Sequence, residues 1–190
     1  MRTITFATKN NGKMYFLTKV LAEYGIKVVQ AKLELPEPRT KDCREIARQK
    51  AIFAFQQLRV PVLVNDGALS IDSLNGFPDT FINYVLETIG IGGILNLLRQ
   101  KGRECAFRDC FVYYYGGSPV FFGSEAKGYL SFCPPEEMRD YFWSVLELIF
   151  TPKNKSKTLA EMTEQECWQW RVEKYRKSFV EPFVEFLLNQ

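Results

Sequence analysis

Apolar and polar positions follow a regular order along the first third of the chain. Short apolar stretches at 3–7 and 27–31 predict strands, and residues 14–24 and 42–58 carry apolar side chains at helical spacing. Residues 61–65 (PVLVN) form a continuous apolar run, typical of a buried strand, which we expect to end at Asp66-Gly67. Alternating strands and helices of this kind predict an α/β fold.

The rest of the chain mixes the two patterns. Residues 105–115 and 119–133 are rich in Phe, Tyr and Val, and Gly116-Gly117-Ser118 joins them, which predicts a long β-hairpin. We expect turns at 69–78, short helices at 81–86 and 94–98, and helix from 163 to 190. Thr163 and Glu166 have the spacing of a capping box, and Pro182 should start a new helix or kink the old one. The predicted sheet is therefore partly antiparallel.

Residues 134–150 are the least clear segment. Met138, Phe142, Val145 and Ile149 keep helical spacing, and Glu137 and its acidic neighbour favour a first helical turn. This periodicity predicts a helix.

A small polar turn, TKNNGK at 8–13, lies between the first strand and the first helix. Backbone N–H groups at a helix N-terminus attract phosphate, and Lys13 adds a positive charge. The spacing does not fit the G-x-x-x-x-G-K-[ST] pattern, which excludes a Walker A loop. An ordinary strand–helix turn is the alternative.

Length and composition exclude several classes of protein. A chain of 190 residues suits one domain over 1–190, and 46% hydrophobic with 25% charged residues is ordinary for a soluble globular protein. A net charge of +3 is too small to favour stable nucleic-acid binding. With no run of 18 apolar residues and no signal-peptide pattern, we expect no membrane partner.

Histidine is absent, which excludes a Ser-His-Asp triad, a Cys-His dyad and any His-ligated metal. The five cysteines are scattered and odd in number, so we expect reduced, buried thiols and a cytoplasmic location. Catalysis must therefore rely on carboxylates, lysines, hydroxyls, backbone amides or cysteine.

Two carboxylates are candidates for a metal site. Asp66 stands at the carboxyl end of the predicted buried strand, where α/β proteins bind ligands, and Glu37 lies in a proline-flanked loop. Carboxylates from two loops can hold Mg²⁺, while Lys13 and Lys50 would balance phosphate charge. The alternatives are a turn carboxylate at Asp66 and a solvated charge at Glu37.

Several motifs, in order, resemble those of the inosine triphosphate pyrophosphatases, which act on non-standard purine nucleoside triphosphates. The matching segments are TKNNGK at 8–13, LPE at 35–37, IARQK at 46–50, PVLVND at 61–66, LNGFP at 74–78, FTP at 150–152 and TLAEM at 158–162. No single motif is specific, but their order and spacing are.

The departures concern the base. The family's F-G-[WY]-D-P-x-F signature aligns with 144–150, where Glu147 stands in for the Asp, and its S-H-R motif falls on Arg171-Val172-Glu173. Asn83 and Asp79 replace a lysine and a glycine of the family. We therefore expect a divergent member with kept phosphate chemistry and altered specificity. An inactive nucleotide-binding relative is the alternative.

The resemblance implies an elongated mixed sheet flanked by helices, with a cleft between two lobes, and a loop with a short strand at 135–150. It implies a homodimer that hydrolyses a nucleoside triphosphate to monophosphate and pyrophosphate with Mg²⁺. It assigns catalysis to Asp66 and Lys13, and the metal to Glu37 and Asp66. The substrate-binding residues that it implies are Thr8, Asn10, Gly12, Lys13, Lys50 and Gly67.

Other side chains have a structural and a functional interpretation. Phe142, Trp143 and Trp168 can stack on a base, but we favour packing in the core or in a dimer interface. For Arg171 we favour a solvated helix charge. Lys153 and the two lysines after it are expected to form a plain basic surface loop, at 152–157.

Overall fold

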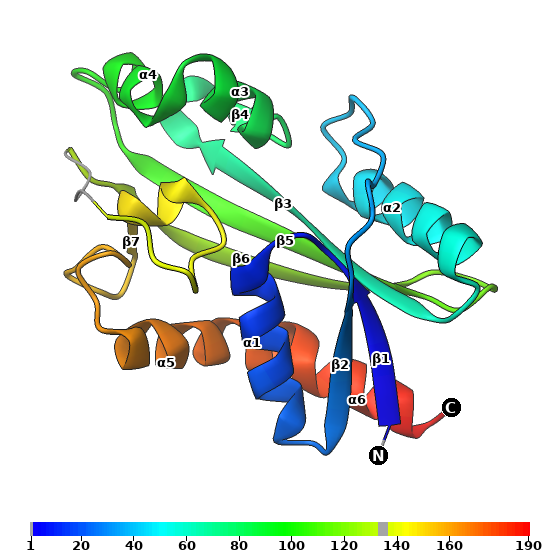
Figure 1. Ribbon diagram of the computed structural model, residues 1–190. Coiled ribbons are helices and arrows are strands. Elements are labelled where there is room, and N and C mark those ends of the chain that lie inside the picture. The colour runs from blue at the N-terminus through cyan, green and yellow to red at the C-terminus, as the bar shows by residue number, and fades with distance from the viewer. Residues whose placement is uncertain (1, 133–136) are drawn as a thin grey trace.

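One mixed β-sheet organises the chain in the computed structural model, which describes residues 2–132 and 137–190 (Figure 1). In these residues the sheet has seven strands, in the order β2-β1-β3-β5-β6-β7, with β4 beside β3. β1 (Arg2–Ala7) runs parallel to β2 (Ile26–Ala31) and to β3 (Val62–Ile71). The remaining pairings are antiparallel, which confirms the prediction of a partly antiparallel sheet.

The strand β3 continues through Asp66 instead of ending there. It pairs with β5 (Glu104–Tyr114) from Val62 opposite Tyr114 to Ile71 opposite Cys105. The expectation that Asp66 closes its strand is therefore wrong, and residues 69–71 of the expected turn belong to β3. Ten consecutive pairings with β5 outweigh the turn preference of an Asp-Gly pair.

The first two helices pack beside strands β2, β3 and β5 of the sheet. α1 (Asn11–Ala22) begins three residues earlier than expected, because the side chain of Asn10 caps it by accepting a hydrogen bond from the Lys13 amide. α2 (Cys43–Leu58) has the expected bounds, with Asp42 as its cap. Small residues on one side of α2 pack against β3 and β5 in an apolar cluster that includes Ala47, Ala51, Val64, Cys110 and Val112.

The predicted hairpin is confirmed as β5 and β6 (Val120–Leu130), and Figure 1 shows both strands running the length of the molecule. Near one end of the hairpin lie a 3₁₀ turn (Asp72–Leu74), β4 (Pro78–Asp79), α3 (Ile82–Thr88) and α4 (Gly90–Leu97). Val85 and Ile94 of these helices are buried in a second core with Phe150. β3 and β5 contribute residues both to this second core and to the apolar cluster beside α2. The half of the molecule around α1 and α2 and the half around α3 and α4 therefore share one sheet.

The helix predicted over 134–150 is wrong for the described part of that segment. Residues 137–144 are irregular, a 3₁₀ turn covers Val145–Leu148, and β7 (Phe150–Pro152) pairs with β6. The Arg139 guanidinium donates hydrogen bonds to the Ala160 and Met162 carbonyls, which ties the segment to a distant turn. The start of this segment and Cys133 lie outside the described residues.

The C-terminal part is helical, as expected. α5 (Glu164–Tyr175) starts with the predicted capping box, and a π-helical turn (Arg176–Val180) leads to α6 (Glu181–Leu188), where Pro182 lies in the first turn. Phe179 and Phe183 from this region pack under the sheet with Phe16 and Phe111. None of the helices in the described ranges is long and apolar enough to cross a membrane.

Candidate active site

A cleft of about 860 Å³ opens over the middle of the sheet. Its walls come from the turn after β1, the loop after β2, the middle of β3, α3, the segment at 143–147 and one side of α5. Most of the residues expected at the site line it. These are Thr8, Asn10, Lys13, Glu37, Lys50, Asp66 and Gly67.

Lys50 joins the two candidate carboxylates. Its ammonium nitrogen lies 2.6 Å from Oδ1 of Asp66 and 2.7 Å from Oε1 of Glu37. Burial disfavours the charged ammonium, but the two carboxylates outweigh that effect and raise the pKa of Lys50. The carboxylates of a strand and of a separate loop therefore converge on one point.

This donor set suits a hard divalent cation. Mg²⁺ is usually bound by one or two carboxylates, and it fills its other positions with water and phosphate oxygens. The described residues contain no group of three or more His, Cys, Asp or Glu side chains arranged to hold a metal. Two converging carboxylates, Glu37 and Asp66, thus fit an ion shared with a phosphate ligand.

Lys13 faces the same cleft, and no carboxylate in the described part of the chain lies within 4 Å of its ammonium. Burial lowers the pKa of Lys13, while the charges of Asp109 and Asp66 oppose this change. A desolvated ammonium without a close counter-ion is a favourable contact for an anionic ligand.

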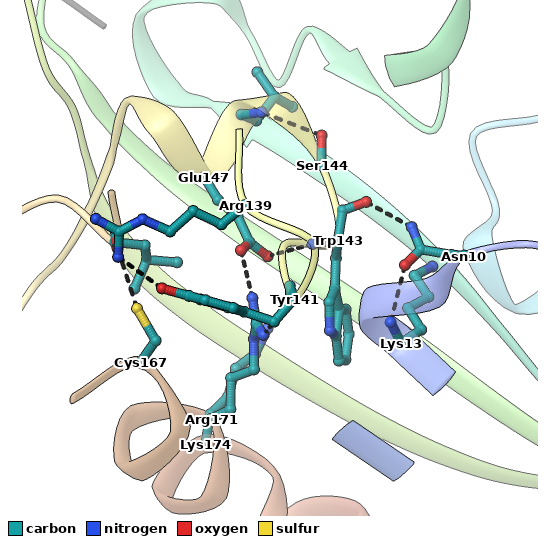
Figure 2. A network of polar contacts seen from close by, with 12 residues as sticks. Asn10, Lys13, Arg139, Tyr141, Trp143, Ser144, Glu147, Cys167, Arg171 and Lys174 are labelled. Atoms are coloured by element: carbon teal, nitrogen blue, oxygen red, sulfur yellow. Dashed lines mark hydrogen bonds and ion pairs between the residues drawn. The ribbon is translucent and has the colours of Figure 1, made fainter. Parts of the chain in front are cut away.

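The polar side chains of the first turn already have structural partners. Asn10 donates from Nδ2 to the Trp143 carbonyl at 2.7 Å while its Oδ1 caps α1 (Figure 2). The Thr8 hydroxyl accepts a hydrogen bond from the Asn10 amide at 3.1 Å. These contacts hold the turn in shape, so the amides of Asn11 and Gly12 are the N–H groups that helix geometry leaves free there.

Gly12 does not line the cleft but packs against the segment at 141–143. A Cβ atom on Gly12 would lie 2.3 Å from the Phe142 carbonyl oxygen. Glycine is therefore needed at this position because two backbone segments approach each other closely. Gly67 does line the cleft, and a Cβ there would lie 3.3 Å from Oδ1 of Asp109.

Arg171 is buried, so the expectation of a solvated helix charge is wrong. It forms an ion pair with the buried Glu147 and donates a hydrogen bond to the Tyr141 carbonyl at 2.8 Å (Figure 2). Burial raises the pKa of Glu147, and the nearby Arg171 opposes that rise. The spacing of Arg171 from Cys167 and Tyr175, which mark the buried side of α5, is the signal that sequence reasoning missed.

A second buried network was not anticipated. The Lys174 ammonium lies 2.6 Å from Oδ2 of Asp109, and the Tyr175 hydroxyl donates to the same oxygen at 2.7 Å. Burial tends to raise the pKa of Asp109, but Lys174 outweighs it and lowers that pKa. Asp109 alternates with Phe107 and Phe111 on the inward face of β5, and a carboxylate among apolar residues of that face is the signal that sequence reasoning missed.

The aromatic residues divide between core and cleft. Phe142 is buried in the core, as expected, and Trp168 packs against Phe16. Trp143 packs against the same core, as expected, but it also lines the cleft, where its ring stacks on Tyr175 at 5.2 Å between centroids. Figure 2 shows the Trp143 indole between Lys13 on one side and Arg171 on the other. The lysines at 153, 155 and 157 are exposed, as expected for a surface loop.

The cleft therefore has two chemically different parts. One part holds two carboxylates and two lysines beside a helix N-terminus, which suits a metal-bound phosphate chain. The other part holds Trp143 with the Glu147–Arg171 and Asp109–Lys174 pairs, and it offers an aromatic ring and polar groups. Together they suit a ligand with a polyphosphate at one end and a ring at the other.

Comparison with known proteins gives a consistent result. The sequence model of the Ham1 family matches residues 4–171. The chain is 35% identical over 189 residues to a dITP/XTP pyrophosphatase of Methanopyrus kandleri, covering 98% of this chain and 96% of that protein. It is 31% identical over 166 residues to an inosine triphosphate pyrophosphatase of Yarrowia lipolytica, covering 86% and 85%.

The fold is similar to that of solved Ham1 structures. A HAM1 protein from Coxiella burnetii superposes with a TM-score of 0.81 at 21% identity, covering 100% of both chains. The Staphylococcus aureus Ham1 protein gives a TM-score of 0.76 at 19% identity, covering 99% of both chains.

Proposed function

The chain belongs to the Ham1 family, and we propose that it hydrolyses a nucleoside triphosphate to a nucleoside monophosphate and pyrophosphate. The observation that carries the proposal is the convergence of Glu37 and Asp66 on the Lys50 ammonium, at 2.7 and 2.6 Å, inside the cleft. Binding alone does not need two carboxylates next to a polyphosphate, because they repel it in the absence of a cation. Their retention favours a hydrolase over an inactive relative.

We propose Mg²⁺ as the cofactor, with Glu37 and Asp66 as the residues that would hold it. When bound, the ion neutralises charge on the phosphates. Lys50 keeps the two carboxylates together, and Lys13 supplies a positive charge on the other side of the phosphate chain. The N-terminal end of α1, beside the cleft-lining Asn10 and Lys13, adds the positive end of the helix dipole.

In the proposed reaction, Asp66 accepts a proton from a water molecule. The water oxygen forms a bond to the α-phosphorus, the bond from that phosphorus to the bridging oxygen breaks, and pyrophosphate leaves. Lys13 stabilises the negative charge that grows on the phosphates. Water supplies the oxygen that the monophosphate gains, so no further reactant is needed.

For the base we propose a non-standard or modified one. Relatives carry the names dITP/XTP pyrophosphatase and inosine triphosphate pyrophosphatase. In this chain the ring end of the cleft has Trp143, Glu147 and Arg171. This combination of a flat aromatic surface with a buried ion pair supports recognition of a polar purine-like ring.

Three further features belong to the proposal. The 190 residues act as a single domain, which the sheet shared by both halves supports. The protein works as a homodimer without nucleic acid, which light scattering behind size-exclusion chromatography tests. It acts in the reducing cytoplasm, where its scattered cysteines stay as thiols.

The decisive experiment is a pyrophosphate-release assay with Mg²⁺ over a panel of triphosphates that includes ITP, dITP, XTP and the standard nucleotides. We expect turnover of at least one non-standard triphosphate and none by the variant Asp66→Asn. Equal activity of Asp66→Asn would remove Asp66 from the mechanism. Nucleotide binding without turnover of any triphosphate would favour the inactive relative.

A further inference from the structure

One helix contacts both oxygens of the Asp66 carboxylate. Lys50 lies 2.6 Å from Oδ1, and the Cys43 thiol donates to Oδ2 at 3.7 Å. Cys43 and Lys50 stand seven positions apart on α2, which places them two turns apart on the same side. The carboxylate is therefore held from one end by a charge and from the other by a thiol.

In the described structure the Cys43 thiol neither caps its helix nor makes a second hydrogen bond. It is the first residue of α2, but the cap is made by Asp42, whose carboxylate accepts hydrogen bonds from the Arg44 and Glu45 amides. Its side chain packs at the edge of the apolar cluster that contains Cys110. The contact with Asp66 is the hydrogen bond that its thiol makes there.

A carboxylate held at one oxygen can still rotate about the bond that joins it to Cβ. A second donor on Oδ2 fixes the plane of the group and leaves Oδ1 directed at the point where Glu37 also arrives. Preorganisation of this kind matters at a metal site, because partners of the ligating groups tune affinity.

We propose that Cys43 is a positioning residue, whose thiol orients the Asp66 carboxylate for divalent-cation binding. The inference rests on the proposed function only in giving Asp66 a metal-binding role. It adds a residue that lies outside every motif on which the family resemblance was based.

The test compares Cys43→Val with Cys110→Val. Both changes replace a thiol by a side chain of similar size in the same apolar cluster, and Cys110 stands opposite Asp66 on β5 without a hydrogen bond to its carboxylate among the described contacts. Mn²⁺ serves as the probe, and its binding is measured by electron paramagnetic resonance without substrate and with a non-hydrolysable triphosphate analogue. The Mg²⁺ concentration for half-maximal turnover is the second readout.

We expect Cys43→Val to bind Mn²⁺ about 3–10-fold more weakly, the effect of losing one modest hydrogen bond to a charged group, whereas Cys110→Val stays within about twofold of the parent chain. Cys43→Ser should recover part of the loss, because a hydroxyl can also donate. Thermal unfolding of all three variants separates this effect from a general loss of stability.

Equal Mn²⁺ affinity in Cys43→Val and Cys110→Val would overturn the proposal. A parent chain that binds Mn²⁺ but hydrolyses no triphosphate would contradict the proposed function, while a selective loss in Cys43→Val would still support the role of Cys43. A parent chain that binds no Mn²⁺ under either condition would overturn both the metal role of Asp66 and the present inference.

Discussion

The Lys50 ammonium lies 2.6 Å from Oδ1 of Asp66, and both side chains are buried. Asp66 comes from the middle of β3 and Lys50 from the third turn of α2, so the pair joins a strand to the helix that covers it. The same ammonium reaches Glu37, whose side chain is 62% exposed, in the loop after β2. A single lysine thus connects the core of the protein to the proposed metal site.

Replacement of Lys50 by Met should affect both stability and activity. Removing one partner of a buried pair leaves a buried charge, so we expect a loss of about 3–5 kcal/mol in the free energy of unfolding, measured in urea. We also expect kcat/KM to fall by at least about 100-fold, as when one charge-stabilising donor is removed from an active site. Lys153→Met, in the exposed loop, is the control and should match the parent chain. An active Lys50→Met protein would contradict the proposed role.

Lys13 should set the alkaline limit of activity. Burial lowers the pKa of Lys13 below 10.5, so its ammonium loses the proton at a lower pH than an ordinary lysine does. As the pH rises, kcat/KM should therefore begin to decrease before pH 10.5 is reached. In Lys13→Arg the charge persists to higher pH, and the falling limb should move upward. The pH dependence of kcat/KM with a triphosphate checks this prediction, and an unchanged alkaline limb in Lys13→Arg would count against it.

The same pKa has a consequence for stability. Between the lowered pKa of Lys13 and 10.5, the unfolded chain binds more protons than the folded one. The contribution of Lys13 to the free energy of unfolding should therefore rise with pH across that window. Urea titrations of the parent chain and Lys13→Arg at several alkaline pH values measure the difference.

Gly12 and Gly92 form a matched pair for substitution by alanine. At Gly12 the new Cβ would lie 2.3 Å from the Phe142 carbonyl oxygen, so we expect destabilisation of about 1–3 kcal/mol through overpacking. The shift should also disturb the Asn10 contact with Trp143 and raise KM. At Gly92, in α4, a Cβ would meet no atom within 4 Å from the other described residues beyond its own helix turn, and we expect stabilisation of up to about 1 kcal/mol. Thermal unfolding of the two variants decides, and equal effects would refute the packing argument.

The Glu147–Arg171 pair should show strong non-additivity. Arg171→Met leaves Glu147 buried without its partner, and we expect a loss of about 3–5 kcal/mol at pH 7. The double variant Arg171→Met with Glu147→Leu should recover most of that loss, because it removes the orphaned charge as well. Urea unfolding of the single and double variants measures the coupling, and additive losses would argue against it.

The pH dependence of Arg171→Met follows from the pKa of Glu147. Burial already raises that pKa above 4.5, and loss of Arg171 should raise it further. The folded state then holds a proton that the unfolded state releases, so stability is highest below pH 4.5 and declines as pH rises through the raised pKa. The deficit of Arg171→Met in the free energy of unfolding should therefore be smaller near pH 5 than at pH 7.

Contacts between residues near in sequence were predictable from the sequence. The helical spacing of 42–58, the capping box of Thr163 and Glu166, and the hairpin joined at 116–118 all appear in the structure. The turn at 8–13 and the carboxylates Glu37 and Asp66 could be selected as candidates from residue type and spacing, and the structure brings them to one cleft. Local propensity and motif order suffice for such features, because few distant groups take part in them.

Only the tertiary structure decided the rest. Asp66 stays within its strand because β5 pairs with β3 along its whole length, and the segment at 137–150 avoids a helix because distant carbonyls bind Arg139. Arg171 is buried, and the Asp109 side chain is only 9% exposed, because partners from other elements neutralise them. A charge is buried or solvated according to which opposite charge the fold brings within about 3 Å, and sequence spacing alone does not reveal that partner.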